Sequence, residues 1–122
     1  MIKVMIFIKR RADLSLEAFR EHYETVHVPL SLTHLPLMQK HARNYVIRRP
    51  DEPEGDYDVV TECWFESWET LKATAAVLAE KRPIFQEDEE RFMDRASIRS
   101  VTVDESVTWQ AGAQERNAAG SP

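Results

Sequence analysis

Four histidines are the side chains of this chain that best suit proton transfer near neutral pH. They are His22, His27, His34 and His41. His27 is the strongest candidate, because it follows Tyr23 by about one turn in a segment with helical periodicity and so lies at the edge of an apolar stripe. An imidazole at such an edge can take a proton from carbon or oxygen and return it within one turnover. The functional interpretation is a catalytic acid/base, and the alternative, which the helix position alone favours, is a capping or surface histidine ahead of Pro29.

The other histidines are weaker candidates. His22 lies about 140° around a regular helix from His27, so we expect a solvated side chain that cannot share one ligand with His27. His27, His34 and His41 follow one another at intervals of seven residues, which on an unbroken helix would suggest a metal site. Two prolines interrupt that helix, and no carboxylate stands at a spacing that would complete a ligand set. We therefore expect neither a metal nor another cofactor.

Aromatic and acidic side chains are candidates for the wall of a substrate cavity beside His27. The predicted substrate-binding residues are Phe19, Tyr23, Tyr45, Glu62 and Trp64. Aromatic rings of this kind can stack on a cyclic substrate, although each ring is also a core candidate, and for Trp64 the core is favoured. Glu62 could orient His27 or serve as a second acid; the alternative is a solvated strand glutamate.

The segment 14–30 is predicted to form the helix that carries His27. Its apolar side chains recur at intervals of three and four residues, which places them on one stripe facing a core. The stripe consists of Leu16, Phe19, Tyr23, Val26 and Leu30. Ser15 suits an N-cap, whereas Pro29 and Pro36 should bend or segment whatever follows. We expect an irregular joint after His27.

Alternation of apolar and polar residues predicts a sheet around this helix. The expected strands are 2–8, 43–48, 57–65 and 98–109. Ser67 can cap a second helix that Pro83 stops, and the acidic run 87–90 is predicted to be a solvated helical face. The order strand, helix, strand, strand, helix, strand predicts an α+β, ferredoxin-like βαββαβ fold with helices on one face of an antiparallel four-stranded sheet.

The second face of this sheet is also expected to be apolar, because the first and third strands carry apolar side chains on both sides. Met5, Phe7 and the side chains of the fourth strand are the candidates for this face. A monomer would expose them to water, so we expect a homodimer packed sheet to sheet, forming a dimeric α/β barrel.

Composition limits the domains and partners. The 122 residues, 43% of them hydrophobic, predict one domain over 1–109, followed by a polar tail over 110–122 that we expect to be disordered. A formal net charge of −5 without a clustered basic face argues against nucleic acid and anionic membranes. The single Cys63 has no basic neighbour and is expected to be a small buried hydrophobe in a reducing, cytoplasmic setting. The apolar N-terminal run is too short to span a membrane.

Several segments resemble the EthD-like family of the dimeric α/β-barrel group: KRR at 9–11, LSLEAFREHYETVHVPL at 14–30, and CWF leading into SWETL. The resemblance extends over residues 1 to about 105, and its most specific part is the run F-R-x-H/Y-Y/W-x-x-x-H-x-P-L. In this chain the run is Phe19, Arg20, His22, Tyr23, His27, Pro29 and Leu30. The resemblance implies a ferredoxin-like dimer with a cofactor-free site between sheet and helices.

Residues and resemblance together lead to the hypothesis of a cofactor-free lyase or isomerase with His27 as its acid/base. The resemblance implies dehydratase, decarboxylase or cyclase chemistry on a small hydrophobic cyclic or polyketide-like substrate. One alternative is a cofactor-independent monooxygenase of the same fold, in which the anion of the substrate reacts with oxygen. Another is a non-catalytic dimer that binds a small ligand.

Overall fold

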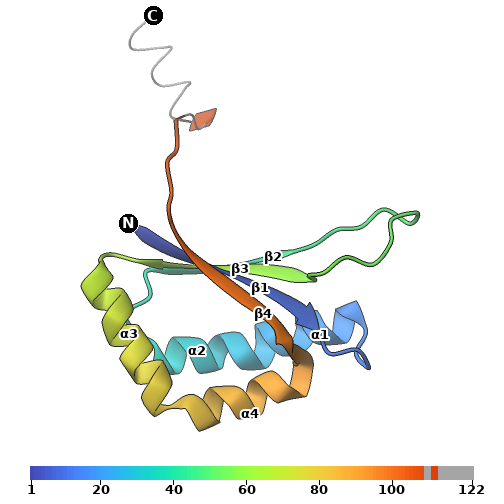
Figure 1. Ribbon diagram of the computed structural model, residues 1–122, viewed down its shortest axis with the longest axis horizontal. Helices are drawn as coiled ribbons and strands as arrows, with labels where there is room; N and C mark the ends of the chain where they lie inside the picture. Colours follow the sequence, from blue (N-terminus) through green and yellow to red (C-terminus); the bar gives the residue numbers. More distant parts are fainter. Residues whose placement is uncertain (109–110, 113–122) are drawn as a thin grey trace, which may run out of the picture.

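Residues 1–108 and 111–112 are described by a computed structural model, in which a four-stranded antiparallel sheet lies on a layer of helices (Figure 1). The strands are β1 (Ile2–Arg10), β2 (Lys40–Tyr45), β3 (Val59–Phe65) and β4 (Met93–Asp104), in the spatial order β2-β3-β1-β4. The helical segments are α1 (Leu16–His22), the π-helical turn η1 (Tyr23–His27), α2 (Val28–His34), α3 (Trp68–Glu80) and α4 (Arg82–Phe92). This arrangement confirms the predicted α+β, ferredoxin-like βαββαβ fold.

Both predicted helix caps are present. The Ser15 hydroxyl accepts a hydrogen bond from the Ala18 N–H at 3.0 Å. Ser67 and Thr70 form a capping box, in which each side chain accepts a hydrogen bond from the backbone N–H of the other residue. Because these bonds satisfy N–H groups that have no partner within the helix, the helices begin where the serines stand.

Strand boundaries differ from the prediction in all four strands: β1 ends at Arg10 where 8 was expected, and β3 begins at Val59 where 57 was expected. The second strand runs from Lys40 to Tyr45, earlier than the predicted 43–48, and β4 begins at Met93 where 98 was expected. Charged side chains interrupt the apolar alternation there, yet backbone pairing of β1 with β4 continues to Arg10 and Met93. The fourth strand was predicted to end at residue 109, but β4 ends at Asp104, and residues 105–108 are not part of a strand. Residue 109 and the predicted tail 110–122, except for residues 111–112, lie outside the described residues.

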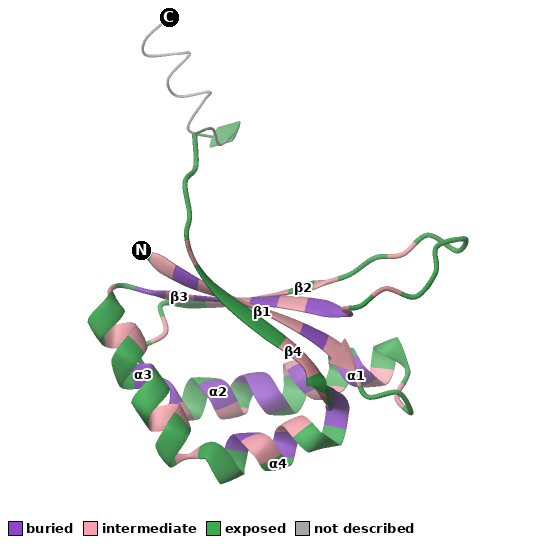
Figure 2. Cartoon of the chain, viewed as in Figure 1, coloured by how far each residue is buried: buried purple, intermediate pink, exposed green. Residues whose placement is uncertain are grey.

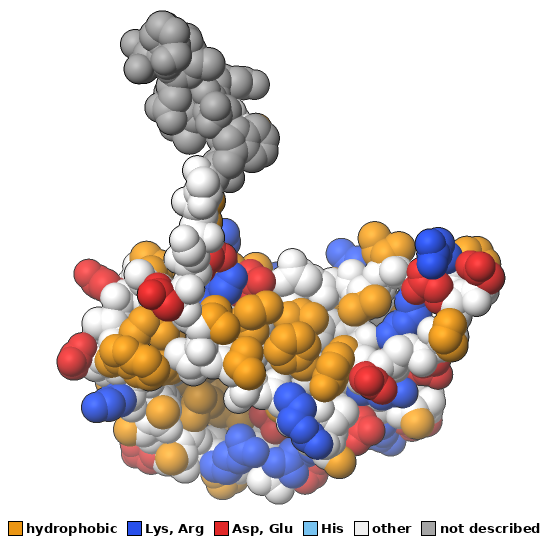
Figure 3. Space-filling model, turned by 45° about the horizontal axis from the view of Figure 1, so that its top comes forward, with side chains coloured by type: hydrophobic (Ala, Val, Ile, Leu, Met, Phe, Trp, Pro, Cys, Tyr) orange, Lys and Arg blue, Asp and Glu red, His pale blue; other side chains and the backbone are white. Residues whose placement is uncertain are grey.

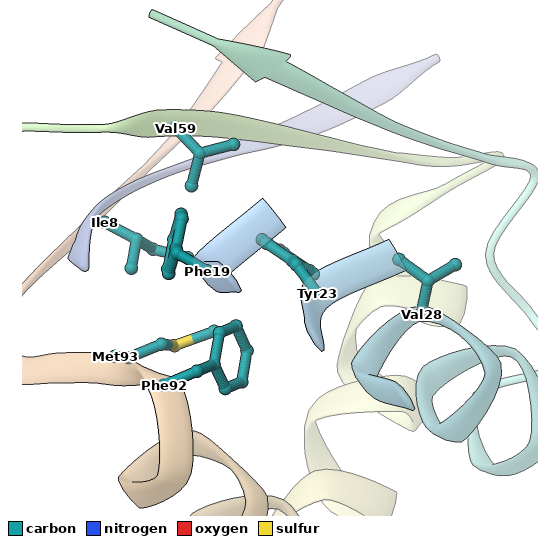
Figure 4. Close-up of a cluster of buried hydrophobic side chains, with 7 residues drawn as sticks. All are labelled: Ile8, Phe19, Tyr23, Val28, Val59, Phe92 and Met93. Atoms are coloured by element: carbon teal, nitrogen blue, oxygen red, sulfur yellow. The ribbon is translucent and has the colours of Figure 1, made fainter. Parts of the chain in front are cut away.

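The hydrophobic core lies between the sheet and the helices (Figures 2 and 4). It consists of Ile8, Phe19, Tyr23, Val28, Val59, Phe92 and Met93. Three members of the predicted stripe lie outside it: Leu16 and Val26 are 48% and 42% exposed, and Leu30 is only partly buried. The helix instead turns Phe19, Tyr23 and His27 towards the sheet, so the buried stripe is narrower and more polar than predicted.

Among residues 1–108 and 111–112, no helix covers the opposite face of the sheet (Figure 1). Hydrophobic side chains gather in a patch on the strand side of the molecule (Figure 3), and Val101 of β4 is 49% exposed. Lys3 is buried on this face, with its ammonium 2.5 Å from Glu105 and 3.6 Å from Glu62. Along the part of the chain that the structure describes, none of the helices has the length and apolar character needed to cross a membrane.

Candidate functional site

A cavity of about 350 Å³ lies between the sheet and the helices. Aliphatic side chains from β1 and α3 form much of its wall, among them Val4, Ile6, Leu71 and Leu78. Its polar side chains include Tyr23, His27, Ser31, His41, Thr61 and Thr74. An apolar cavity of this size with a few converging polar groups is typical of a small-molecule site.

His27 lies in the cavity wall and pairs with a buried carboxylate. Its Nδ1 is 2.8 Å from Oδ2 of Asp88, and the two residues are 7% and 2% exposed. Burial raises the pKa of Asp88, but the hydrogen bonds from His27 and His22 outweigh it and hold the pKa below its usual value. Since an ionised carboxylate can only accept, Nδ1 donates its proton to Asp88. The lone pair of a neutral His27 is then on Nε2, for which residues 1–108 and 111–112 provide no hydrogen-bond partner.

His22 binds the same carboxylate, contrary to the prediction that it would be a solvated residue unable to share a ligand with His27. Its Nε2 is 2.9 Å from Oδ1 of Asp88, and its side chain is 23% exposed. Its ring also packs on Phe92, with the ring centroids 4.6 Å apart. His22 therefore links the buried carboxylate to the surface.

The π-helical turn explains why His22 and His27 face the same partner. In η1 the Val28 N–H donates to the Tyr23 carbonyl, which closes a turn between residues five apart. Such a turn is one residue wider than an α-helical one, so residues at this spacing come close to alignment. Pro29 lacks an N–H and cannot continue a regular hydrogen-bond ladder, which favours irregularity here. The irregular segment thus precedes Pro29 and ends at His27, where we expected it to begin.

His41 is a second histidine in the cavity wall, and it was not predicted as a site residue. It stands on β2 opposite Cys63 of β3, on the face of the sheet that the helices cover. The Nη1 of Arg43 donates to its Nδ1 at 3.0 Å. Burial, assisted by the positive charge of Arg43 and by His27, lowers the pKa of His41 to about 4. His41 is therefore neutral near pH 7, with its proton on Nε2.

Arg43 is held in place by a carboxylate at the surface end of the site. Glu24 accepts two hydrogen bonds from its guanidinium, at 2.7 and 2.8 Å, and a third from the Tyr45 hydroxyl at 2.5 Å. The Arg43 hydrogen bonds outweigh partial burial and lower the pKa of Glu24 to about 2. This bidentate pair fixes the guanidinium that in turn fixes the proton on His41.

Tyr23 lies between the two histidines. Its ring centroid is 5.5 Å from that of His27 and 6.5 Å from that of His41. Its hydroxyl and that of Thr61 are 2.6 Å apart. Burial raises the pKa of Tyr23, so the hydroxyl stays protonated. Tyr23 thus provides a rigid wall that spaces the two imidazoles.

The structure brings only some of the predicted site residues together. His27 and Tyr23 line the cavity, whereas Phe19 and Tyr45 pack beside Tyr23 without lining it. Glu62 and Trp64 lie on the opposite face, because strand alternation turns their neighbours Thr61 and Cys63 towards the helices.

Glu62 and Trp64 were predicted to line the cavity beside His27, but their contacts lie on the other face of the sheet. The ring of Trp64 lies under the ammonium groups of Lys3 and Lys40, at 5.0 and 4.6 Å. Glu62 faces Lys3, so it is remote from His27, and Asp88 is the carboxylate that orients the imidazole.

Asp88 was missed because the run 87–90 was predicted to be solvated throughout. A signal was present, since Asp88 follows Phe85 by three residues and precedes Phe92 by four, which places it on the buried face of α4. His41 was missed because the second strand was expected to begin two residues after it.

The histidines spaced by seven residues do not converge. His27 and His41 line the cavity, but Nδ1 of His34 is 3.0 Å from Nζ of Lys81, outside the cavity wall. Among the residues that the structure describes, no three His, Cys, Asp or Glu side chains are placed to hold a metal ion.

The fold and the site define a ferredoxin-like α+β protein with a buried histidine–carboxylate pair facing an apolar cavity. The sequence matches the family described as EthD domain over residues 11–96, and the chain therefore belongs to the EthD family. Comparison with curated proteins gave no match.

Solved structures share the fold at low sequence identity. An ethyl tert-butyl ether D (EthD) family protein from Bacillus halodurans has a TM-score of 0.63 and 19% identity over 87% of this chain and 99% of its own. At3g17210 from Arabidopsis thaliana has a TM-score of 0.61 and 16% identity over 90% and 100% of the two chains. HapK from Hahella chejuensis has a TM-score of 0.60 and 12% identity over 90% and 97%. At these identities the similarity is one of fold.

Proposed function

We propose that this EthD protein is a cofactor-free lyase or isomerase that moves a proton on a small hydrophobic, cyclic or polyketide-like molecule, with His27 as the acid/base. The observation that carries the proposal is the buried Asp88–His27 pair, in which Nδ1 is bound to Asp88 and the ring lines the cavity, so that Nε2 is left for a ligand. A buried carboxylate is costly to keep, and here it is bound to two imidazoles. Such a pair is the usual means of orienting a catalytic histidine.

The pair would act in two proton transfers. His27 Nε2 accepts a proton from the substrate, and Asp88 stabilises the imidazolium that forms, because its carboxylate already accepts the Nδ1 hydrogen bond. The same nitrogen then returns the proton to another atom of the substrate or to a leaving group. Return to carbon gives isomerisation, and return to a departing hydroxyl gives elimination of water.

The same base would also serve the alternative of a cofactor-independent monooxygenase, in which removal of a proton precedes reaction with oxygen. Oxygen consumption that depends on substrate and on His27 would favour this alternative. A ligand-binding dimer without catalysis accounts less well for the Asp88–His27 pair, since binding an apolar molecule needs no buried ionised carboxylate.

We also propose that the chain works as a homodimer in which the exposed face of the sheet is covered by a second copy. Apolar side chains gather on this face, and Val101 is exposed on β4 (Figure 3). An obligate interface of this kind would bury on the order of 2,000 Å² or more in total.

The test is hydrogen exchange at carbon. The protein is incubated in D₂O with small cyclic ketones such as cyclohexanone and 2-tetralone, and deuterium incorporation is followed by ¹H NMR. We expect catalysed exchange that His27→Ala lowers by about two to four powers of ten, with the fold retained by circular dichroism. His34→Ala is the matched control, because His34 lies outside the cavity wall. Equal exchange by the wild type and His27→Ala would refute His27 as the base.

A further inference from the structure

The cavity holds two imidazoles with opposite hydrogen-bonding capacity. Nδ1 of His27 donates to Asp88, so its Nε2 carries a lone pair. Nδ1 of His41 accepts from Arg43, so its Nε2 carries a proton. Both rings line the same cavity, and both make edge contacts with the ring of Tyr23. One side of the cavity therefore presents a base and the other a neutral donor.

The donor state of His41 is fixed by its partner. A guanidinium has only N–H donors and no acceptor, so Nδ1 of His41 must be unprotonated to receive the hydrogen bond from Arg43. Arg43 is itself bound by both carboxylate oxygens of Glu24, which holds it against the edge of β2. Within residues 1–108 and 111–112, no protein group accepts a hydrogen bond from His41 Nε2. Since no fully buried polar side-chain atom there lacks a partner, Nε2 is accessible and is left for a ligand.

We infer that His41 is a further catalytic residue, whose Nε2–H binds the carbonyl oxygen of the substrate, and that the substrate is a small apolar carbonyl compound with a hydrogen on the adjacent carbon. This inference rests on the proposed function, because it assigns His27 the base that removes that hydrogen. The cavity wall also includes Arg82, whose guanidinium pairs with Glu89 at 4.0 Å, and the guanidinium of Arg43 beside His41 is paired with Glu24.

The step balances within the two side chains and the substrate. The lone pair of His27 Nε2 takes the proton from the α-carbon, and the electrons of the broken C–H bond form a carbon–carbon double bond. The carbonyl π electrons move onto oxygen, where negative charge develops and the hydrogen bond from His41 strengthens. The imidazolium of His27 then returns the proton to the α-carbon or to a β-hydroxyl group that leaves as water.

A neutral imidazole suits this position better than a cationic one. An imidazolium beside His27 would repel the positive charge that His27 gains when it accepts the proton. A neutral Nε2–H still stabilises a developing enolate, and it does so without titrating near pH 7, as burial lowers the pKa of His41 to about 4.

The first experiment uses 4-nitrophenol, whose phenolate mimics an enolate oxygen and whose ionisation is read from its absorbance. We expect the wild type to lower the apparent pKa of the bound phenol by about one unit or more. His41→Phe should abolish this shift, His41→Gln should keep part of it through the amide N–H, and His27→Ala should keep it. No shift in the wild type, or a shift lost in His27→Ala and kept in His41→Phe, overturns the inference.

The second experiment is deuterium exchange into cyclohexanone with the same variants. We expect His41→Phe to lower the exchange rate by about 10²–10³, His41→Gln to lower it less, and His34→Gln to leave it unchanged. Exchange that needs His27 but is equal in the wild type and His41→Phe would overturn the role of His41 while the proposed function stands. If exchange does not depend on His27, the proposed function fails, and the phenolate shift still decides whether His41 binds an oxyanion.

The third experiment reads the proton directly. Long-range ¹H–¹⁵N spectra of the histidine rings in the wild type should show His41 as the neutral Nε2–H form between about pH 5.5 and 7.5. An Nδ1–H form, or a cationic ring at neutral pH, overturns the inference irrespective of activity.

Discussion

His41 should make the free energy of unfolding depend on pH in the range between the ordinary histidine pKa of 6.5 and its pKa of about 4 in the folded protein. Burial lowers the pKa of His41 from 6.5 to about 4, so the folded state resists protonation that the unfolded chain accepts. Below pH 6.5 the unfolded state therefore binds more protons, and the free energy of unfolding falls until about pH 4, where the loss is complete. At about pH 5 the expected loss is about 2 kcal/mol relative to pH 7.5.

The assay is urea unfolding of the wild type and His41→Gln at both pH values. For a typical urea dependence of about 1–3 kcal/mol per molar, a change of about 2 kcal/mol moves the midpoint by roughly 1 M. Glutamine cannot titrate, so its variant should lose less stability than the wild type by this amount. The comparison cancels the contribution of the remaining histidines, because both proteins contain them.

Carboxylates do not mask the effect in this window. Glu24 has a pKa of about 2 and that of Asp88 is held below its usual value, so both stay ionised at about pH 5. If the wild type and His41→Gln lose the same free energy between the two pH values, His41 is not the buried neutral group described above.

Three further changes test the site and the assembly. Asp88→Asn should keep the fold but lower exchange activity by about 10²–10⁴, because a neutral amide cannot stabilise the positive charge on the His27 imidazolium as a carboxylate does. Activity equal to that of the wild type would contradict the role of the Asp88–His27 pair. Glu24→Gln should lower the free energy of unfolding by about 1 kcal/mol at neutral pH, a value that allows for the partial exposure of the Glu24–Arg43 pair. The cost should disappear in acid unfolding curves as pH falls from about 4.5 to about 2, where wild-type Glu24 is protonated too. Light scattering of the wild type should give twice the chain mass of 14.2 kDa, and Val101→Asp should lower the measured mass towards that of a single chain. A monomeric wild type would contradict the dimer.

Those features of the fold that depend on local chemistry were predictable. Ser15 and Ser67 begin helices because a hydroxyl satisfies free N–H groups whatever the tertiary structure. The third strand, predicted at 57–65 and found at 59–65, was recognised because the alternation extends over its whole length, with every second residue buried. The residues that determine these features are close in sequence to the helix start or the strand that they determine.

The site depended on information that local patterns do not contain. Which carboxylate of 87–90 turns inward is decided by how α4 packs on its neighbours, through Phe92 on Phe19 of α1 and Phe85 on His27 of η1. The proton on His41 depends on Arg43 two residues away, and Arg43 depends in turn on Glu24 in another element. His27 could be identified as a candidate from its own segment, but its carboxylate partner is 61 residues distant in the chain.

The wide π-helical turn is needed because of the number of residues between α1 and α2. Each residue of a regular helix advances the angular phase by about 100°, and the π-helical turn takes up one residue more than an α-helical turn. If η1 became α-helical at the same chain length, α2 would rotate by about 100° relative to α1. Ser31 and Leu35 would then leave the cavity wall, and His22 and His27 would diverge. Deleting one residue from η1 would instead restore a regular helix that keeps α2 in phase with α1. The extra residue and the wide turn that absorbs it are thus as much a part of the site as the side chains.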